Sequence, residues 1–297
     1  FSCIYLYYLF VLFLGFFQSL TLISTIRPEK CISFGSYATF PPLLAVLFLK
    51  LFFRIDIFIH EQNSIMGKVN LFFLKYTKGI FVNFNFIKNL EKKFLSKKYH
   101  VGLPSRNNLK SKRLDLNINR KKIVLFIYGG SQGSVPLIKN LLLIFQNIDK
   151  KIFKKIKIFV QAPKILSNNL ENSLNYLNAD YEIREFYNNI DEVLSITDIA
   201  ITRAGAGTIN DLIRFKIPSI IIPLHHSIHN HQYSNAKYLS DRNAAILMNE
   251  TDFNVDINSL ILKKLINDYD QQENMKNSLK KLILPDANKL MMNIIYK

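Results

Sequence analysis

The sequence predicts an α/β protein of two domains, each built on a parallel sheet covered by helices. Short apolar runs with strand character alternate with helical segments along most of the chain. In the second half, glycine-rich turns follow two of these runs, at 129–133 and 203–207. Residues 97–120, in contrast, are polar and basic without a hydrophobic period. We therefore expect the domain boundary there, with domains at 1–106 and 107–297.

Residues 1–26 carry no charged side chain. By length and hydropathy alone this run predicts a transmembrane helix. A cleaved signal peptide fits badly, because the run has no basic n-region and no small-residue cleavage site. A third interpretation is a very apolar helix that lies at the membrane interface.

The first half then alternates strands and helices in the way a parallel sheet requires. We expect strands at 29–34, 55–59 and 79–82, separated by helices at 41–53 and 67–76. Pro41 and Pro42 suit the first turn of their helix, where a missing N–H costs nothing.

The second half repeats this alternation more regularly. We expect strands at 122–128, 156–161, 181–186, 198–202 and 219–223. Helices are expected after 129–133, in the polar region after 161, at 190–195 and at 208–215. Thr208 is a plausible cap for the last of these helices.

Composition excludes several classes of protein. The 297 residues are 49% hydrophobic, enough for a real core in two domains. The net charge of +17 is scattered, and neither zinc-finger spacing nor an aromatic platform accompanies it, so nucleic acid is a poor candidate partner. The two cysteines have no framework spacing, which fits a reducing compartment.

The two glycine-rich turns are the strongest functional signal in the residues themselves. Each stands between a strand and a helix, so free N–H groups at the helix start can meet an anion. Arg203 can pair with a phosphate, or it can be a surface cation. Asp211 can accept hydrogen bonds from ribose hydroxyls, or it can compensate the helix dipole. Two such turns at the carboxyl ends of strands predict a nucleotide diphosphate site.

Two polar clusters have weaker interpretations. His225, His226, His229 and His231 lack nearby acidic partners, so we expect no metal site. Gln232 and Asn235 stand three apart at an expected helix start, so both can face one ligand. His60 beside Glu61 can be an acid–base pair, although this dipeptide also occurs without a catalytic role.

Seven motifs occur in an order and spacing that resemble one family, from about Phe17 to Ala287. They are GSYATFPP, HEQNSIMGKVN, GLPSR, GGSQG, EFYNNIDEVL, TRAGAGTINDL and HQYSNA. The family is that of the peptidoglycan N-acetylglucosaminyltransferases that act on undecaprenyl-linked muramyl-pentapeptide. The resemblance implies a GT-B architecture of two Rossmann-like domains. It also implies inverting transfer of N-acetylglucosamine from UDP-N-acetylglucosamine, without a metal or another cofactor, because helix N-termini can stabilise the departing diphosphate.

The resemblance also implies site residues. His60 and Glu61 match motif positions on the acceptor side, where an orienting or acid–base role is a hypothesis. Ser131 is expected at the diphosphate, Asp211 at the ribose and Gln232 at the sugar hydroxyls. The full set of expected substrate-binding residues is Asn63, Arg106, Ser131, Tyr187, Arg203, Ala206, Gly207, Thr208, Ile209, Asn210, Asp211, Gln232 and Asn235.

Some positions depart from the family pattern. Asp211 stands where Glu is usual, Leu103 where Asn is usual, and Phe34 where a Gly is usual. The family's first strand and its Gly-rich loop, whose His is the usual candidate base, would lie before Phe1. We therefore expect the N-terminal domain to be incomplete and this chain alone to lack that base.

The family resemblance changes the interpretation of the N-terminal apolar run. It implies peripheral attachment to the cytoplasmic face of the bacterial inner membrane, aided by lysines near anionic lipid. Residues 1–106 would then be the partial acceptor and membrane-facing domain, and 107–297 the donor-binding domain, with the last helix packed back on the first. Association with other cell-wall synthesis proteins is a further expectation. The alternatives are another GT-B glycolipid transferase, or an inactive nucleotide-binding remnant.

Overall fold

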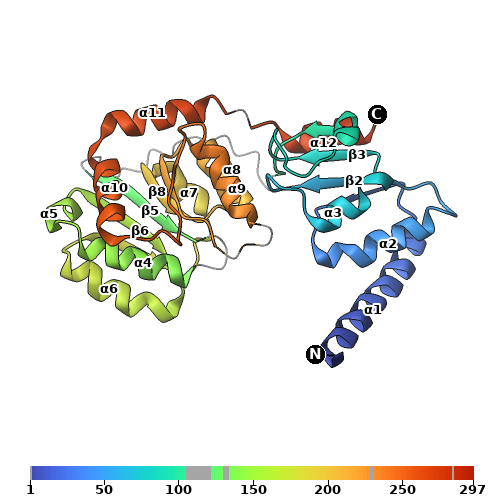
Figure 1. Cartoon of the computed structure of the whole chain (residues 1–297), viewed down its shortest axis with the longest axis horizontal. Helices are drawn as coiled ribbons and strands as arrows, with labels where there is room; N and C mark the ends of the chain where they lie inside the picture. The colour runs from blue at the N-terminus through green and yellow to red at the C-terminus, as the bar shows by residue number, and fades with distance from the viewer. Residues whose placement is uncertain (1, 105–121, 130–133, 226, 228–229, 283) are drawn as a thin grey trace. The chain divides into compact units, whose positions relative to one another are not determined.

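The computed structural model describes the chain except residues 1, 105–121, 130–133, 226, 228–229 and 283 (Figure 1). It divides into two compact units, Phe1–Arg106 with Pro285–Lys297, and Asn107–Leu284. In the described residues each unit has a parallel sheet with helices packed on it. The predicted α/β class with two Rossmann-like domains is confirmed.

The sheet of the first unit has the order β1-β2-β3-β4, with parallel neighbours throughout. Its strands are β1 (Lys30–Ser33), β2 (Asp56–Glu61), β3 (Gly79–Val82) and β4 (Lys98–His100). The first three agree with the predicted strands. The expectation that regular structure stops at residue 97 is wrong, because β4 continues the sheet. It has three residues, which is too short to show an alternating pattern.

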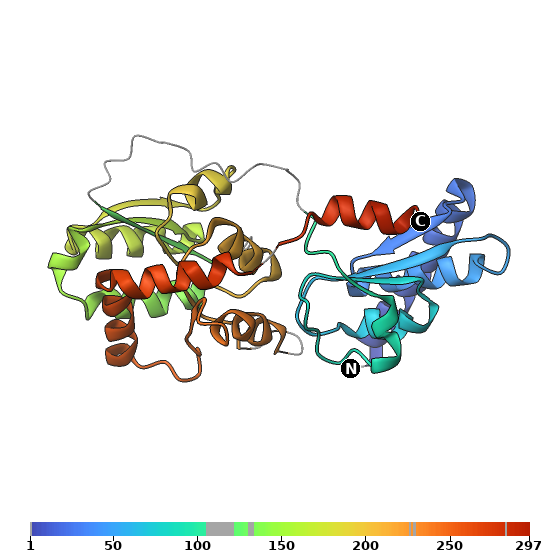
Figure 2. The ribbon, with the colours of Figure 1, turned by 90° about the horizontal axis from the view of Figure 1, so that it is seen from above.

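The helices of this unit come from both ends of the chain. They are α1 (Ser2–Ile26), α2 (Phe40–Leu49), α3 (Lys68–Phe73) and α12 (Ala287–Ile295). The first helix, α1, packs mainly on α2. The second helix ends earlier than the predicted Phe53, because the N–H groups of Phe52 and Phe53 both bond to Leu49 O and close a turn. Met291 and Ile295 of α12 pack on Phe58 and Phe81, so α12 lies against β2 and β3 (Figure 2).

The first helix has an apolar surface that the unit covers only in part. Leu20 and Ile23 pack against the cluster of α2 and β2, whereas side chains from Tyr5 to Leu14 are exposed. By length and composition, Tyr5–Ile26 is long and apolar enough to span a bilayer.

The sheet of the second unit has the order β10-β9-β8-β5-β6-β7, again parallel. Its strands are β5 (Ile123–Tyr128), β6 (Ile156–Gln161), β7 (Asp180–Arg184), β8 (Ile199–Thr202), β9 (Ser219–Ile221) and β10 (Ile246–Leu247). The chain builds outward from β5 through β6 and β7, then crosses to β8 on the other side. The strand order therefore reverses between β5 and β8, and open α/β sheets bind ligands at such a switch point.

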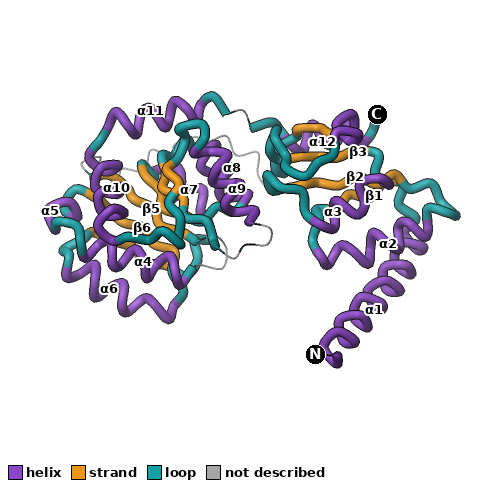
Figure 3. The backbone as a smooth tube through the Cα atoms, in the orientation of Figure 1, coloured by secondary structure: helices purple, strands orange, loops and turns teal. Residues whose placement is uncertain are grey.

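Helices lie on both sides of this second sheet (Figure 3). They are α4 (Val135–Gln146), α5 (Lys150–Phe153), α6 (Ser167–Tyr176), α7 (Ile190–Ile196), α8 (Ala206–Phe215), α9 (His231–Ser240), α10 (Val255–Asn267) and α11 (Tyr269–Lys280). A continuous apolar core joins α4, α6 and α10 to β5 and β6. This packing holds the carboxyl ends of β5 and β8 in place.

Candidate functional site

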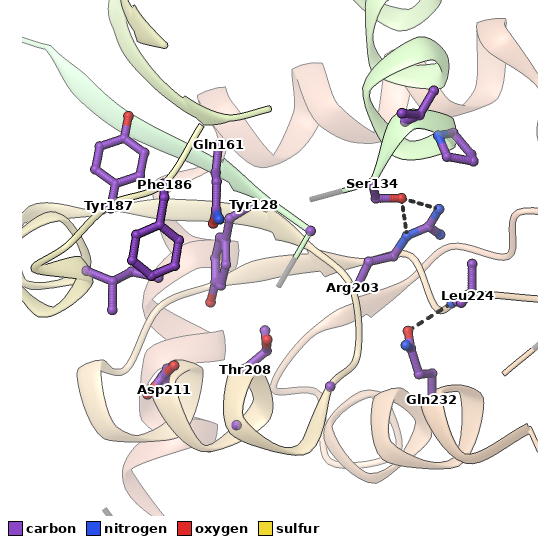
Figure 4. A pocket seen from close by; sticks show the side chains of 16 residues that line it. Tyr128, Ser134, Gln161, Phe186, Tyr187, Arg203, Thr208, Asp211, Leu224 and Gln232 are labelled. Atoms are coloured by element: carbon purple, nitrogen blue, oxygen red, sulfur yellow. Dashed lines mark hydrogen bonds between the residues drawn. The ribbon is translucent and has the colours of Figure 1, made fainter. Parts of the chain in front are cut away.

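A pocket of about 790 Å³ opens at the switch point of the second sheet (Figure 4). The last residues of β5 and β6 line it, together with residues from the segments that follow β5, β7, β8 and β9. They are Tyr128, Gly129, Ser134, Val135, Pro136, Gln161, Phe186, Tyr187, Ile190, Arg203, Gly205, Gly207, Thr208, Asp211, Leu224 and Gln232. The pocket is therefore built by both segments that carry the glycine-rich turns.

The start of α8 forms one wall of the pocket. Gly205 is the N-cap with an extended backbone, and the helix runs from Ala206 to Phe215. The prediction that Thr208 caps this helix is wrong, because Thr208 lies in its first turn. A Cβ added at Gly207 would meet nothing within 4 Å, so the pocket is open at this helix start. Here N–H groups without intrahelical partners can face an anion.

Asp211 lines the pocket from the second turn of the same helix. Its position beyond the first turn rules out simple dipole compensation there. The pKa of the Asp211 carboxyl is raised from 3.8 to about 7, mainly by burial and in addition by the charge of Asp191, while Arg214 acts in the opposite direction. A carboxyl group with this pKa is ready to change its charge when a ligand arrives near neutral pH.

Arg203 lies inside the protein, so the prediction of a surface cation is wrong. Its Nη2 donates to Glu250 Oε1 at 2.7 Å, and its Nε and Nη2 donate to Ser134 Oγ at 3.1 and 2.9 Å. Its Nη1 also donates to Ile222 O at 3.0 Å. Ser134 in turn caps α4. The guanidinium therefore links the turn after β8 to the start of α4 and to the segment after β10.

Gln232 and Asn235 hold one residue of the glycine-rich turn from two sides. Gln232 Oε1 accepts from Ala204 N at 3.3 Å and from Leu224 N at 3.0 Å, and Asn235 Nδ2 donates to Ala204 O at 3.1 Å. Gln232 lines the pocket, whereas Asn235 is buried behind the turn. The expectation that both face one ligand is therefore wrong for Asn235.

Aromatic side chains form the opposite end of the pocket. The ring of Tyr187 meets that of Phe126 edge-on at 5.4 Å, and Phe126 stacks on Tyr128 at 4.5 Å. Burial raises the pKa of the Tyr187 hydroxyl, which donates to Glu182 O at 3.3 Å. Phe186 beside it is 56% exposed. These flat apolar surfaces suit a planar ring.

His60 and Glu61 do not form the acid–base pair that their sequence suggested. They are neighbours on β2, and neighbouring side chains of a strand point to opposite faces. His60 Nε2 donates to Gly102 O at 2.8 Å, and burial lowers the pKa of its imidazole. Glu61 Oε2 accepts from Gly67 N and from Asn70 Nδ2, both at 2.8 Å. Both side chains hold loops of the first unit.

The other predicted site residues have varied surroundings. Ala206 and Ile209 are buried on α8, Asn210 is half-buried on the same helix, and Asn63 is half-buried in the first unit. Arg106, Ser131, His226 and His229 lie outside the described residues. Among the residues that the structure describes, no group of three or more His, Cys, Asp or Glu side chains is placed to hold a metal ion.

Sequence reasoning missed several residues that line or support the pocket. Tyr128 and Gln161 end β5 and β6, Phe186 follows β7, and Ser134 and Glu250 hold Arg203. Only the first two had a signal, because the last residue of a parallel strand lies at the edge where ligands bind.

The chain matches two models of one protein family. The glycosyltransferase family 28 C-terminal domain matches residues 124–291, and the N-terminal domain of that family matches residues 7–82. The two matches therefore include segments of both halves of the chain.

Two individual proteins are similar to this chain over most of its length. The UDP-N-acetylglucosamine–N-acetylmuramyl-(pentapeptide) pyrophosphoryl-undecaprenol N-acetylglucosamine transferase of Rickettsia bellii is 34% identical over 298 residues, which cover 98% of this chain and 81% of that protein. The protein of the same name from Rickettsia akari is 32% identical, over 89% of this chain and 75% of that protein.

Solved structures share the fold. The crystal structure of Acinetobacter baumannii MurG matches with a TM-score of 0.78 and 21% identity, over 97% of this chain and 80% of that one. A structure of Staphylococcus aureus MnaA with UDP matches with a TM-score of 0.64 and 13% identity, over 96% of this chain and 80% of that one. At these identities the likeness concerns the fold alone.

Proposed function

The chain belongs to glycosyltransferase family 28, and we propose that the pocket at the switch point of its second sheet binds the donor nucleotide. The protein is a UDP-N-acetylglucosamine-dependent glycosyltransferase of peptidoglycan synthesis. It moves N-acetylglucosamine from the UDP donor to undecaprenyl-pyrophosphoryl-N-acetylmuramyl-pentapeptide, which converts lipid I to lipid II.

The position of Asp211 carries the assignment of the pocket. A carboxyl group one turn inside α8 stands between the helix start and the aromatic end of the same cavity. With a ribose at Asp211, a diphosphate reaches the open helix start beside Gly205 and Gly207. The base then lies toward Tyr187, and the sugar lies toward Gln232. This order places each part of UDP-N-acetylglucosamine against groups of matching chemistry.

The chemistry of the transfer needs stabilisation of the departing UDP. In an inverting transfer the acceptor C4 hydroxyl attacks the sugar C1, the C1–O bond to the diphosphate breaks, and a base takes the hydroxyl proton. Negative charge develops on the diphosphate, and the positive end of α8 acts on it there. Arg203 supports this helix start through Ser134 and Glu250, so its role is to hold the wall in place.

In the first unit we assign positioning roles to His60 and Glu61. Glu61 holds the loop that contains Asn63, since Asn63 N donates to its Oε1 at 3.0 Å. His60 fixes the backbone at Gly102. Asn63 remains a proposed donor contact.

We further propose peripheral attachment at the cytoplasmic face of the inner membrane. The acceptor is anchored by an undecaprenyl chain, so the enzyme has to work at a lipid surface. Side chains from Tyr5 to Leu14 expose an apolar surface of matching chemistry, and the net charge of +17 favours anionic lipid.

Calorimetric titration of the chain with UDP-N-acetylglucosamine, with UDP-glucose as the control, tests the donor assignment. Selective binding of UDP-N-acetylglucosamine is the expected result. Equal affinity for both nucleotides would favour another glycolipid transferase. Absence of binding by a chain with a cooperative thermal transition would overturn the assignment of the pocket.

A further inference from the structure

The outward face of α10 exposes apolar side chains that no described part of the chain covers. Ile257 is 58% exposed and Leu260 is 66% exposed. The opposite face of the same helix carries Asn258, Leu262 and Leu265, which are buried in the second unit. Figure 3 shows α10 and α11 at the surface of this unit. Neither Ile257 nor Leu260 lines the donor pocket, so the proposed function leaves this face without a role.

Helical periodicity places three exposed residues of α10 in one line. Ile257, Leu260 and Lys264 are three and four residues apart, so they lie on one face. Asp256, in the first turn, is exposed at the edge of this face. Lys264 is exposed in the last turn. The face therefore has an acidic end and a basic end, with Leu260 four residues from each charge.

An open hollow of about 690 Å³ lies beside the basic end of this face, at the corner between α10 and α11. Asp268 fixes the corner, because its Oδ1 accepts from Gln271 N at 2.8 Å and caps α11. Tyr269, the next residue, is 68% exposed. The residues that line the hollow are Leu260, Lys263, Lys264, Asn267, Asp268, Tyr269 and Asp270. The hollow can therefore receive an apolar side chain from outside.

Two copies of this face fit each other when one copy is reversed. With Leu260 on the two-fold axis of an antiparallel helix pair, Asp256 of each copy lies opposite Lys264 of the other. Ile257 of each copy then lies opposite Lys263, which lines the hollow. A two-fold interface uses the same surface on both subunits, so that surface has to complement itself. A partner with charges of one sign would instead meet a like charge at one end of α10.

We propose that α10 is the contact surface of a homodimer, in which two α10 helices pair antiparallel across Leu260. Ile257 and Leu260 supply the apolar contact, and two Asp256–Lys264 ion pairs set the direction of the helices. Contact through one helix and Tyr269 lies at the low end of interface sizes. The dimer is therefore weak, with a dissociation constant on the order of 10 μM. Attachment to a membrane concentrates the chain and favours such a pair.

Sedimentation of the full chain in detergent tests this contact, because detergent covers the apolar surface of α1. We expect a monomer–dimer equilibrium with a dissociation constant on the order of 10 μM. Leu260→Glu brings two carboxylates together on the axis and should raise this constant at least about tenfold. Ile165→Glu, at a position of the same unit that is 83% exposed, is the matched control and should leave it unchanged. Both variants should keep the thermal midpoint of the unsubstituted chain, since both positions are exposed.

Exchange of charges separates this geometry from association through another surface. Asp256→Lys and Lys264→Asp each place like charges opposite each other, so each variant alone should be monomeric. A mixture of the two variants should dimerise, because both lysines of one chain then face both aspartates of the other.

The possible outcomes decide between the two-fold contact and its alternatives. A chain that stays monomeric at about 200 μM would overturn the proposal and leave this face to a different protein. Dimers that persist unchanged in Leu260→Glu would place the contact elsewhere, for example on α1. Single charge variants that dimerise as well as their mixture does would contradict the antiparallel pairing.

Discussion

Arg203 and Glu250 form an ion pair of 2.7 Å in which the arginine side chain is 4% exposed and the glutamate side chain 17%. The pair joins the turn after β8 to the segment after β10, and the same guanidinium bonds to Ser134 at the start of α4. Removing one member of such a pair leaves the other buried without its partner. The stability of the second unit and the shape of its pocket therefore depend on the same contact.

We expect Arg203→Ala to lower the free energy of unfolding by about 3–5 kcal/mol, because Glu250 and Ser134 lose their partner. Glu250→Gln keeps a hydrogen-bond acceptor and should cost about 1–2 kcal/mol. Urea unfolding followed by circular dichroism measures both values. Arg242→Ala is the control, since Arg242 is exposed over the ring of Tyr238 and should change stability by less than about 0.5 kcal/mol. Equal effects of the Arg203 and Arg242 substitutions would contradict this account.

The pKa of Asp211 predicts a pH-dependent donor affinity. The pKa of this carboxyl is about 7 in the folded chain, and ribose hydroxyls donate best to the ionised form. Binding below that pH has to release a proton, so affinity should fall by up to about tenfold per pH unit below 7 and level off above it. Titration with UDP-N-acetylglucosamine is suitable because its diphosphate ester does not titrate in this range.

Two substitutions separate the causes of this pH dependence. Asp211→Asn should weaken binding by about tenfold or more and remove the pH dependence, because no titrating group remains. Asp191→Asn removes a charge that raises the pKa of Asp211, so the midpoint of the affinity profile should move to lower pH. A profile that stays the same in Asp211→Asn would show that another group titrates.

The same raised pKa predicts a stability effect of opposite sense. The folded carboxyl holds its proton up to about pH 7, whereas the unfolded one releases it near 3.8. The free energy of unfolding therefore falls as pH rises through that window, by up to about 4 kcal/mol. Asp211→Asn should raise the thermal midpoint at about pH 8 and change it little at about pH 4. A midpoint that does not rise at the higher pH would contradict a raised pKa of Asp211 in the folded chain.

Gly207 allows stability and binding to be separated at the helix start. An added Cβ meets no atom within 4 Å, and alanine favours a helix by up to about 1 kcal/mol over glycine. Gly207→Ala should therefore fold as well as the unsubstituted chain or better. The methyl group enters the proposed diphosphate site, so affinity for UDP should fall, by about tenfold if it displaces one hydrogen bond. Unchanged UDP affinity in this variant would place the diphosphate elsewhere.

The fold was more predictable from the sequence than the site was. Strands β3 and β6 have the predicted bounds, because their apolar runs end at turn signals. The burial of Arg203 in an ion pair was not predictable, because its partner Glu250 lies 47 residues further along the chain. Thr208 was chosen as the cap because side-chain oxygens favour that position, but Gly205 takes it without one. His60 and Glu61 point to opposite faces of the sheet because they are neighbours on one strand. This was predictable from strand periodicity, but the predicted strand ended at residue 59, two residues too early.

The exposed part of α1 predicts membrane binding that is independent of donor binding. Phe10 and Phe13 are each 58% exposed, so Phe10→Glu with Phe13→Glu should leave the fold of the first unit intact. A charged side chain costs about 2.5–3.5 kcal/mol in a bilayer core, so two should reduce flotation with phosphatidylglycerol-containing vesicles at least tenfold. Affinity for UDP-N-acetylglucosamine should stay the same, because the pocket belongs to the second unit. Tyr176→Glu, at an exposed position of α6, is the matched control and should float like the unsubstituted chain. If the double variant floats equally well and added salt releases it, basic side chains rather than α1 hold the protein on the lipid.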